Sequence, residues 1–235
     1  RRMLLTQRAY AEGCRAFALY VGIQLDEAKY NNNERAGRIS ELLTPVVKAF
    51  LTDKGLDGAV MGQQVLGGHG FIKEWGMEQI VRDARIGQIY EGANGIQALD
   101  LVGRKIMRDG GSLILELLED MKATDVDEAY NGQLIEACDR LARSTQSVVA
   151  RGKNDPHLPG AVSVDFLDMV GMTMCAWVWA LMASRAPADD FGVAKKATAR
   201  YFYDRLLPKT LGLERSIEAE ADAVMEMPQA LFSPG

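Results

Sequence analysis

Glu91 is the carboxylate whose neighbours are best suited to a catalytic role. It lies between Tyr90 and Gly92 in the run RDARIGQIYEGANGIQ, residues 82–97. A glycine inside a helix costs about 1 kcal/mol relative to alanine, so Gly92 and Gly95 would weaken a surface helix. We expect them to leave room for a ligand instead. Glu91 would then act as a general base aimed into a pocket, or alternatively cap the following helix, where the dipole favours negative charge.

A second glycine-rich segment, QVLGGHGF, covers residues 64–71. Adjacent glycines at Gly67 and Gly68 allow the backbone to approach a flat or charged ligand and to present its amide groups. The alternative interpretation is a helix C-cap followed by a turn. The pattern by itself leaves this segment open between a binding role and an ordinary helix end.

The other residues that could bind metal or react are few. The cysteines Cys14, Cys138 and Cys175 and the histidines His69 and His157 are too widely spaced for a ligand set, so no metal site is expected. Each cysteine falls in a helical pattern, which predicts buried free thiols and a cytoplasmic location. The 27 basic and 32 acidic residues give a net charge of −5, which argues against a nucleic-acid partner.

Helices must position both glycine segments. Apolar residues recur at three- and four-residue spacing, which predicts an all-α fold with no strand. The first helices are expected over residues 3–30, 39–54, 56–66, 77–85 and 95–107. Later ones are expected over residues 112–122, 126–151, 161–185, 190–207 and 210–223. Pro45 should lie near a first turn or at a kink, and residues 67–71 should form a loop.

The run RDGGS, residues 108–112, predicts a boundary between two helical bundles, 1–110 and 111–235. Ser112 is expected to cap the helix that follows. The apolar run at 169–184 is shorter than the about 20 residues of a membrane span, so we expect a buried core helix there. The chain opens inside a helical pattern without methionine or signal peptide, and we expect it to be a fragment of a longer protein.

The two glycine segments together resemble the C-terminal signature of the flavin-dependent acyl-CoA dehydrogenases. That signature has a glutamine, two residues and a Gly-Gly pair, then RDA, an isoleucine pair, YEG and a final Ile-Gln. QVLGGHGF and RDARIGQIYEGANGIQ match it at the same spacing. The resemblance implies that residues 1–110 are part of the family's C-terminal helical domain. The version YEGANGIQALDLVGRK resembles a longer bacterial subgroup with an extra helical domain, which residues 111–235 fit.

The resemblance implies a role for each residue of the signature. Glu91 would be the catalytic base that removes the α-proton of an acyl-CoA thioester, while FAD accepts the β-hydrogen as hydride and trans-2-enoyl-CoA forms. The backbone N–H of Glu91 would donate to the thioester oxygen, and Gly92 would leave room for the substrate. FAD contacts would come from Gln64, Val65, Leu66, Gly67 and Gly68, facing a neighbouring subunit, and from Ala93, Asn94 and Gly95. The family usually has threonine where Ala93 stands, so one hydroxyl contact would be missing.

The family also implies a homo-oligomer, dimer or tetramer, that acts in fatty acid metabolism and passes electrons to electron-transfer flavoprotein or a similar acceptor. The family's other domains, which supply most flavin contacts, are not in this sequence. We therefore expect the chain alone to bind FAD weakly and not to turn over acyl-CoA. The alternatives are an acyl-CoA oxidase, or a non-catalytic helical interaction or oligomerisation module of the same fold.

Residues 111–235 are expected to pad the bundle and the oligomer interface. Their basic cluster is expected to form a solvated helix face, with contact to a CoA phosphate or a partner subunit as the alternative. The cluster consists of Lys195, Lys196, Arg200 and Arg205.

Overall fold

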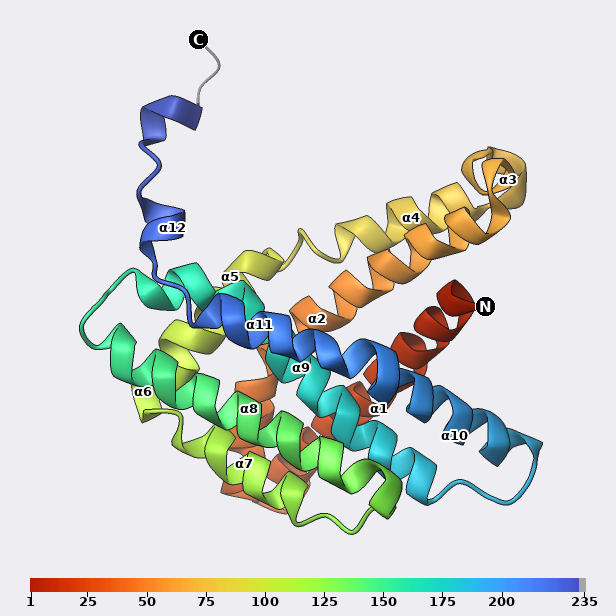
Figure 1. The fold of residues 1–235 in the computed structure, drawn as a ribbon, viewed down its shortest axis with the longest axis horizontal. Coiled ribbons are helices and arrows are strands. Elements are labelled where there is room, and N and C mark those ends of the chain that lie inside the picture. The colour runs from red at the N-terminus through yellow and green to blue at the C-terminus, as the bar shows by residue number, and fades with distance from the viewer. Residues whose placement is uncertain (233–235) are drawn as a thin grey trace.

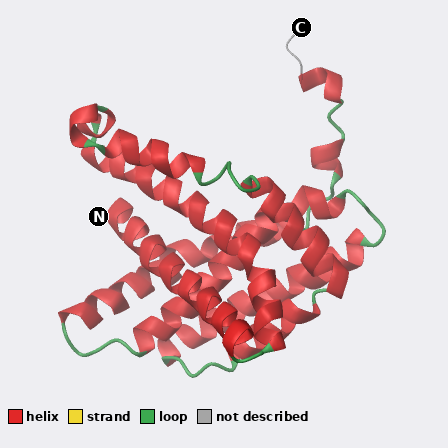
Figure 2. Cartoon of the chain, turned by 180° about the vertical axis from the view of Figure 1, so that it is seen from behind, coloured by secondary structure: helices red, strands yellow, loops and turns green. Residues whose placement is uncertain are grey.

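The computed structural model describes residues 1–232, in which all regular structure is helical (Figures 1 and 2). The first half contains α1 (Arg2–Tyr30), α2 (Glu34–Leu66), α3 (Gly68–Phe71), the 3-10 turn η1 (Lys73–Trp75), α4 (Met77–Ile86), α5 (Asn94–Leu99), the π-helix η2 (Asp100–Ile106) and α6 (Met107–Asp109). The second half contains α7 (Ser112–Lys122), α8 (Glu128–Gly152), α9 (Leu158–Ser184), α10 (Asp190–Tyr201), the π-helix η3 (Phe202–Leu206), the 3-10 turns η4 (Leu207–Lys209) and η5 (Gln229–Phe232), and the helices α11 (Thr210–Ile217) and α12 (Asp222–Met225). The predicted all-α class is confirmed.

The helix α2 is longer than the sequence pattern predicted. Two helices were expected between residues 39 and 66, but α2 runs unbroken through Pro45. It begins earlier because the Asn33 side chain accepts a hydrogen bond from the Ala36 N–H at 3.1 Å, which caps the helix. Pro45 is tolerated inside the helix because its ring is buried, as are Leu42 and Val46 nearby in α2.

Two glycine pairs shape the ends of the helices. Gly67 has φ of +61° and ends α2, and the residues after it form the short helix α3 where a loop was predicted. Gly110 and Gly111, with φ of +68° and +76°, separate α6 from α7 at the predicted boundary. Only glycine enters this left-handed region without steric cost, so Gly67, Gly110 and Gly111 suit the turns they make.

The predicted cap at Ser112 is wrong. Asp109 satisfies the first amides of α7 instead, because its carboxylate accepts from the Gly111 N–H at 2.8 Å and the Leu113 N–H at 3.1 Å. The Ser112 hydroxyl lies near Glu116 and makes no cap. A charged acceptor binds amides more strongly than a hydroxyl, and the two left-handed glycines bring it within reach.

The helix α9 lies at the centre of the buried core and contacts both halves. The fully buried Trp179 donates its indole N–H to the Ala9 carbonyl of α1 at 3.0 Å. A Cβ at Gly171 would lie 2.3 Å from the Phe50 ring, so α9 approaches α2 as closely as a glycine allows. Buried side chains of both halves form one cluster. Separate folding of residues 1–110 and 111–235 stays a prediction.

The helix α9 is long and apolar enough to cross a membrane by length and composition, but 83% of its most apolar stretch is buried inside the fold. It packs as the core helix that was predicted. The cysteines are also buried, and all three thiols are free, as predicted. Burial raises the pKa of Cys138 to about 12, which keeps that thiol protonated and unreactive.

Candidate functional site

The loop that carries Glu91 connects α4 to α5 and has an unusual backbone. Glu91 has φ of +50° and Gly92 has φ of +88°, so two consecutive residues are left-handed. The Gln97 side chain donates to the Glu91 carbonyl at 3.3 Å. A left-handed conformation costs a residue other than glycine about 1–2 kcal/mol, so surrounding contacts must hold Glu91 in place.

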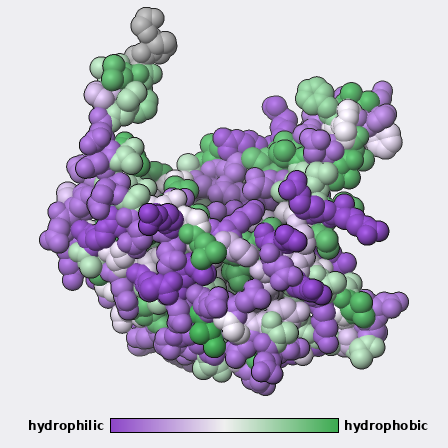
Figure 3. Space-filling model, in the orientation of Figure 1, coloured by the Kyte–Doolittle hydropathy of each residue, from purple (hydrophilic) through white to green (hydrophobic). Residues whose placement is uncertain are grey.

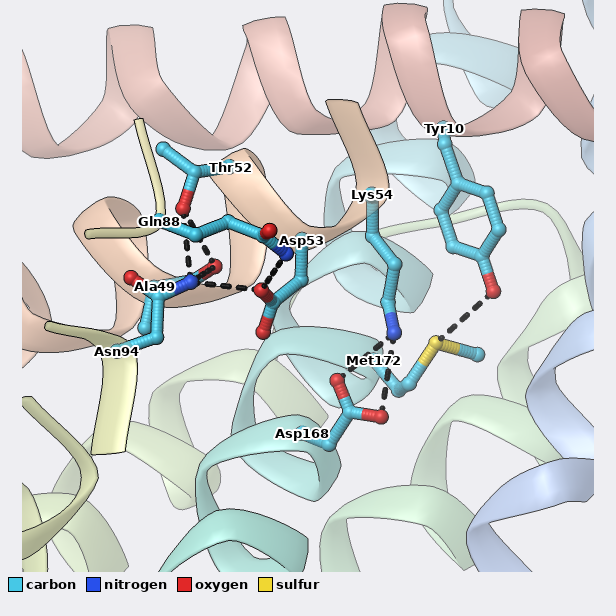
Figure 4. Close-up of polar contacts among 9 residues, drawn as sticks. All are labelled: Tyr10, Ala49, Thr52, Asp53, Lys54, Gln88, Asn94, Asp168 and Met172. Atoms are coloured by element: carbon cyan, nitrogen blue, oxygen red, sulfur yellow. Dashed lines mark hydrogen bonds and ion pairs between the residues drawn. The ribbon is translucent and has the colours of Figure 1, made fainter. Parts of the chain in front are cut away.

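Those contacts come from α2 and meet at Asn94, the first residue of α5 (Figure 4). The Asn94 amide group donates to three acceptors on α2: the Ala49 carbonyl at 3.2 Å, Thr52 Oγ1 at 2.9 Å and Asp53 Oδ1 at 2.6 Å. Asp53 Oδ1 also accepts from Gln88 Nε2, on the other side of Glu91, at 2.5 Å. The loop is therefore tied to α2 both before and after the candidate base.

Lys48 of α2 adds a charged contact to the same loop. Its Nζ donates to the Gly92 carbonyl at 2.7 Å and to Asn94 Oδ1 at 2.8 Å. It also lies over the Tyr90 ring, 5.9 Å from the ring centroid. We call Lys48, Thr52 and Asp53 the α2 anchor.

Glu91 itself is exposed in this chain. The helix-cap alternative is wrong, because Ala93 is the N-cap residue of α5 and no side chain caps that helix. Within residues 1–232, the backbone N–H of Glu91 donates to no acceptor of the chain. The carboxylate and the amide of Glu91 are therefore both free for a ligand.

The neighbours of Glu91 differ in what they offer to a ligand. A Cβ at Gly92 would lie 2.7 Å from Gln97 Nε2, whereas the space around Gly95 is open. Ala93 and Gly95 are exposed. Asn94 was assigned to FAD contact, but its side-chain amide is occupied by the α2 anchor.

The other residues assigned to FAD lie elsewhere. The helices α2 and α4 form a hairpin that projects from the bundle, with α3 at its tip (Figure 1). Exposed at this tip are Gln64, Val65, Leu66, Gly67 and Gly68. The ten residues of α4 separate this tip from the Glu91 loop, which is about 15 Å of helix. The structure therefore brings the predicted site residues together as two groups, one at each end of α4.

The tip also exposes large apolar side chains, visible as green atoms on the hairpin in Figure 3. Phe71 is 79% exposed and Trp75 is 55% exposed. A groove of about 800 Å³ runs beside them between α2 and α4, and its lining combines apolar side chains such as Val60 and Ile86 with charged ones such as Arg82 and Asp83. Large exposed apolar side chains of this kind are typical of a face that contacts another protein surface or a ligand.

A cavity with charged and apolar side chains in its lining lies beside the anchor. It measures about 290 Å³ and is lined by Asp53, Asn94 and Asp168 among others. Lys54 of α2 forms an ion pair with Asp168 of α9 across it, at 2.9 Å (Figure 4). This pair connects the helix that carries the anchor to the core helix of the second half.

Close to this ion pair, Tyr10 of α1 donates its hydroxyl to the sulfur of Met172 at 3.6 Å. Burial, and then the nearby charge of Asp168, raise the pKa of Tyr10 far above its usual range. The phenol therefore stays protonated, and it serves packing rather than proton transfer.

The α2 anchor was missed from the sequence. Its residues recur at helical spacing on one face of α2, which is the pattern of any solvated helix face. Their partner Asn94 lies more than forty positions away, with sequence separations of 41 to 46 residues. A single sequence carries no local signal for such a pairing.

The basic cluster of the second half is divided between ion pairs and solvent. Lys195 pairs with Glu12 of α1 at 2.7 Å, and Arg200 pairs with Asp204 at 3.4 Å. Arg205 is exposed and lines an open hollow of about 780 Å³. Arg200 and Arg205 fit the expected solvated helix face, whereas Lys195 does not, because its side chain is only 15% exposed and joins α10 to α1.

Comparison with known proteins gives matches over nearly the whole chain. Residues 1–107 match the family model described as acyl-CoA dehydrogenase, C-terminal domain, and residues 115–228 match the one described as acetyl-CoA dehydrogenase C-terminal like. The 3-methylmercaptopropionyl-CoA dehydrogenase of Ruegeria pomeroyi is 37% identical over 96% of this chain and 41% of its own length.

Other relatives match over a similar extent. The broad-specificity linear acyl-CoA dehydrogenase FadE5 of Mycobacterium tuberculosis is 30% identical over 99% of this chain and 43% of its own length. A butyryl-CoA dehydrogenase of Syntrophomonas wolfei is 26% identical over 99% of this chain and 42% of its own length. The chain thus spans less than half of the relatives it matches. It belongs to the acyl-CoA dehydrogenase family and corresponds to the C-terminal part of its members.

Proposed function

We propose that this chain supplies the catalytic base and part of the cofactor surface of an FAD-dependent acyl-CoA dehydrogenase. The observation that carries the proposal is the geometry of Glu91. Its carboxylate and its backbone N–H are both free, on a left-handed turn that α2 holds from both sides. A surface glutamate without a task would not need such a turn, because strained residues concentrate at functional sites.

The residues of this chain suit proton abstraction from an acyl-CoA thioester. The Glu91 carboxylate takes the α-proton, and the Glu91 N–H donates to the thioester oxygen as negative charge develops there. Gly92 has no side chain, which lets the Gln97 amide approach the loop and bond to the Glu91 carbonyl. FAD, when bound, accepts the β-hydrogen as a hydride, so that the product is a trans-2-enoyl-CoA.

The chain's two groups of candidate cofactor residues fit two different FAD molecules. Residues 93–95 lie beside the base and would contact the FAD that accepts its hydride. Residues 64–68 lie at the far end of α4, with open space around Gly67 and Gly68, and would contact the FAD of a neighbouring subunit. This division supports a homo-oligomer, dimer or tetramer, in which each hairpin tip meets a partner.

Residues 1–232 leave the surroundings of Glu91 open to solvent. A carboxylate that removes a weakly acidic C–H proton, however, works best where water is excluded. We therefore propose that the isolated chain does not turn over acyl-CoA. The complete enzyme would act in the cytoplasm and pass its electrons to electron-transfer flavoprotein or a similar acceptor.

The test uses the complete flavin-containing polypeptide that includes these residues, with Glu91→Gln as the variant. Short, long, branched and thioether acyl-CoAs are screened with an artificial electron acceptor and without oxygen. The wild type should form enoyl-CoA from at least one of them, and Glu91→Gln should lower the rate by several orders of magnitude while it keeps its flavin. A variant that works normally would leave the interaction module as the better explanation, and peroxide release in air would indicate an oxidase.

A further inference from the structure

We propose that Lys48 is a positioning residue for Glu91, and that it holds the base by fixing the loop on both sides of it. This inference rests on the proposed function, because it concerns the same reaction. The contacts of Lys48 lie in the loop around Glu91, where they include the Gly92 carbonyl and the Asn94 side chain, so it acts through the backbone and side chains that flank Glu91.

The contacts of Lys48 converge on one short stretch of chain. Its Nζ lies 5.9 Å from the centre of the Tyr90 ring, 2.7 Å from the Gly92 carbonyl oxygen and 2.8 Å from Asn94 Oδ1. These three residues directly surround Glu91. A shift of the Lys48 ammonium would therefore move the residue before the base and the peptide after it together.

The hydrogen bonds of the Lys48 ammonium go to neutral groups. Lys48 is half-buried, and within residues 1–232 it forms no ion pair with a carboxylate. Its acceptors are neutral oxygens of the loop. An ammonium group binds such oxygens more strongly than a neutral donor does, so its charge is directed at the Gly92 peptide and the Asn94 amide.

The Asn94 amide is held from opposite sides by opposite charges. Lys48 donates to its oxygen, and its nitrogen donates to the carboxylate of Asp53 at 2.6 Å. This arrangement orients the amide dipole between a cation and an anion on the same helix. Asn94 begins α5, so its fixed position also fixes where the left-handed turn at Glu91 and Gly92 must end.

The consequence for the reaction is geometric. Both functional groups of Glu91, the carboxylate and the backbone N–H, are displaced when the φ angle of Glu91 changes or the following peptide rotates. A misplacement of about 1 Å at a reacting group lowers rates by about 100-fold. The Lys48 contacts therefore hold the base and the thioester hydrogen-bond donor in one preorganised geometry.

The test compares three variants in the flavin-loaded enzyme. Lys48→Met removes the charge and keeps the length of the side chain, and Lys48→Arg restores a cation. Lys29→Met is the matched control, because Lys29 also lies over a tyrosine ring, 4.8 Å from the centre of Tyr30, at the end of α1 and away from the loop. Each variant is measured for kcat, KM, flavin content and the isotope effect with substrate deuterated at the α-carbon.

Lys48→Met should lower kcat by about 10- to 100-fold with little change in KM or flavin content. Its α-deuterium isotope effect should rise, because proton abstraction becomes more rate-limiting. Lys48→Arg should recover part of kcat, and Lys29→Met should behave as the wild type. A wild-type kcat in Lys48→Met would overturn the inference. A loss of activity that only follows lost flavin, with an unchanged isotope effect, would equally overturn it by indicating a merely structural role.

A second measurement separates this inference from the proposed function. Hydrogen exchange on the 235-residue chain reports on the backbone N–H groups of Tyr90 and Asn94. The Tyr90 N–H donates to the Ile86 carbonyl at the end of α4, and the Asn94 N–H donates to the Gln88 carbonyl. Both should exchange faster in Lys48→Met and stay unchanged in Lys29→Met. A wild-type enzyme that acts on no acyl-CoA would overturn the proposed function. Unchanged hydrogen exchange in Lys48→Met would separately overturn the positioning role of Lys48.

Discussion

The two ends of α4 carry the two groups of candidate cofactor residues, and they are supported in opposite ways. At the Glu91 end, the α2 anchor binds the loop through charged and amide groups before and after the base. At the tip, Gly67 and Gly68 have open space around them, and Phe71 and Trp75 are largely exposed. One end is preorganised by its own chain, whereas the other has a surface suited to a partner.

The difference teaches which parts of the site this chain can build alone. A residue proposed as a general base must be held in one geometry for proton transfer, and the contacts that hold the Glu91 loop come from α2 of the same chain. A surface that contacts a neighbouring subunit gains its order on association, when its apolar side chains become buried. The helix α2 serves both ends, because it carries the anchor in its middle and Gln64 to Leu66 at its end.

The largest expected effect compares the tip of the hairpin with the buried core through two tryptophans. Trp179 is fully buried between α9 and α1, and Trp75 at the tip is 55% exposed. Trp179→Ala should lower the free energy of unfolding by about 3–5 kcal/mol, because it leaves a large cavity. Trp75→Ala should change it by less than about 0.5 kcal/mol. Urea unfolding of the 235-residue chain measures both.

The same variants test whether the two halves share one core. The buried cluster crosses the predicted boundary, so Trp179→Ala should destabilise residues on both sides of it and leave a single unfolding transition. Trp179→Phe serves if the alanine variant does not fold, with the same direction and a smaller effect. Two separate transitions, of which only one shifts, would show that residues 1–110 and 111–235 unfold independently.

A smaller effect is expected when an amide side chain at each end of α4 is replaced, which compares the two ends directly. Asn94→Leu removes the bonds to Lys48, Thr52 and Asp53, while Lys48 keeps the Gly92 carbonyl and Asp53 keeps Gln88 as partners. It should lower the free energy of unfolding by about 1–3 kcal/mol, because several hydrogen bonds of about 0.5–1.5 kcal/mol each are lost. Gln64→Leu, at the exposed tip, should change it by less than about 0.5 kcal/mol. Equal effects in urea unfolding would mean that the anchor adds no stability.

The helices could be predicted from sequence because their apolar spacing is local. The exceptions have local causes as well. The helix α2 continues through Pro45 because burial outweighs one lost hydrogen bond, and Asp109 displaces Ser112 as a cap because a carboxylate is the stronger acceptor. These outcomes depend on competition between neighbours, which propensity alone does not resolve.

The candidate site was predicted in a different way. Glu91 and the glycines were found through a family resemblance, because their spacing is specific. The anchor could not be found, since Lys48 and Asn94 are separated by 46 residues and become neighbours only when α5 folds back onto α2. The positive φ of Glu91 is likewise a product of these contacts, and no residue preference for glutamate predicts it.

The smallest expected effect concerns an ion pair that lies at neither end of α4. Burial alone would raise the pKa of Glu12, but hydrogen bonds from Lys195 and Arg8 outweigh it and hold the pKa below its usual value. A carboxyl whose pKa is lowered by folding stabilises the protein above its unfolded pKa, and this contribution is lost as the pH falls through the folded value. Acidification below about pH 4.5 should therefore remove under about 1 kcal/mol through this group, as is usual for a partly exposed pair.

Glu12→Gln isolates that contribution, because it keeps the shape of the side chain and removes its charge. The variant should lose a few tenths of a kcal/mol near neutral pH, and its stability should then decline less steeply than that of the wild type as the pH falls. Hydrogen exchange should rise slightly and equally at both ends of α4, since the pair joins α1 to α10 and contacts neither end. Selective loosening of the Glu91 loop by Glu12→Gln would contradict this, and it would mean that the loop depends on the whole bundle rather than on its anchor in α2.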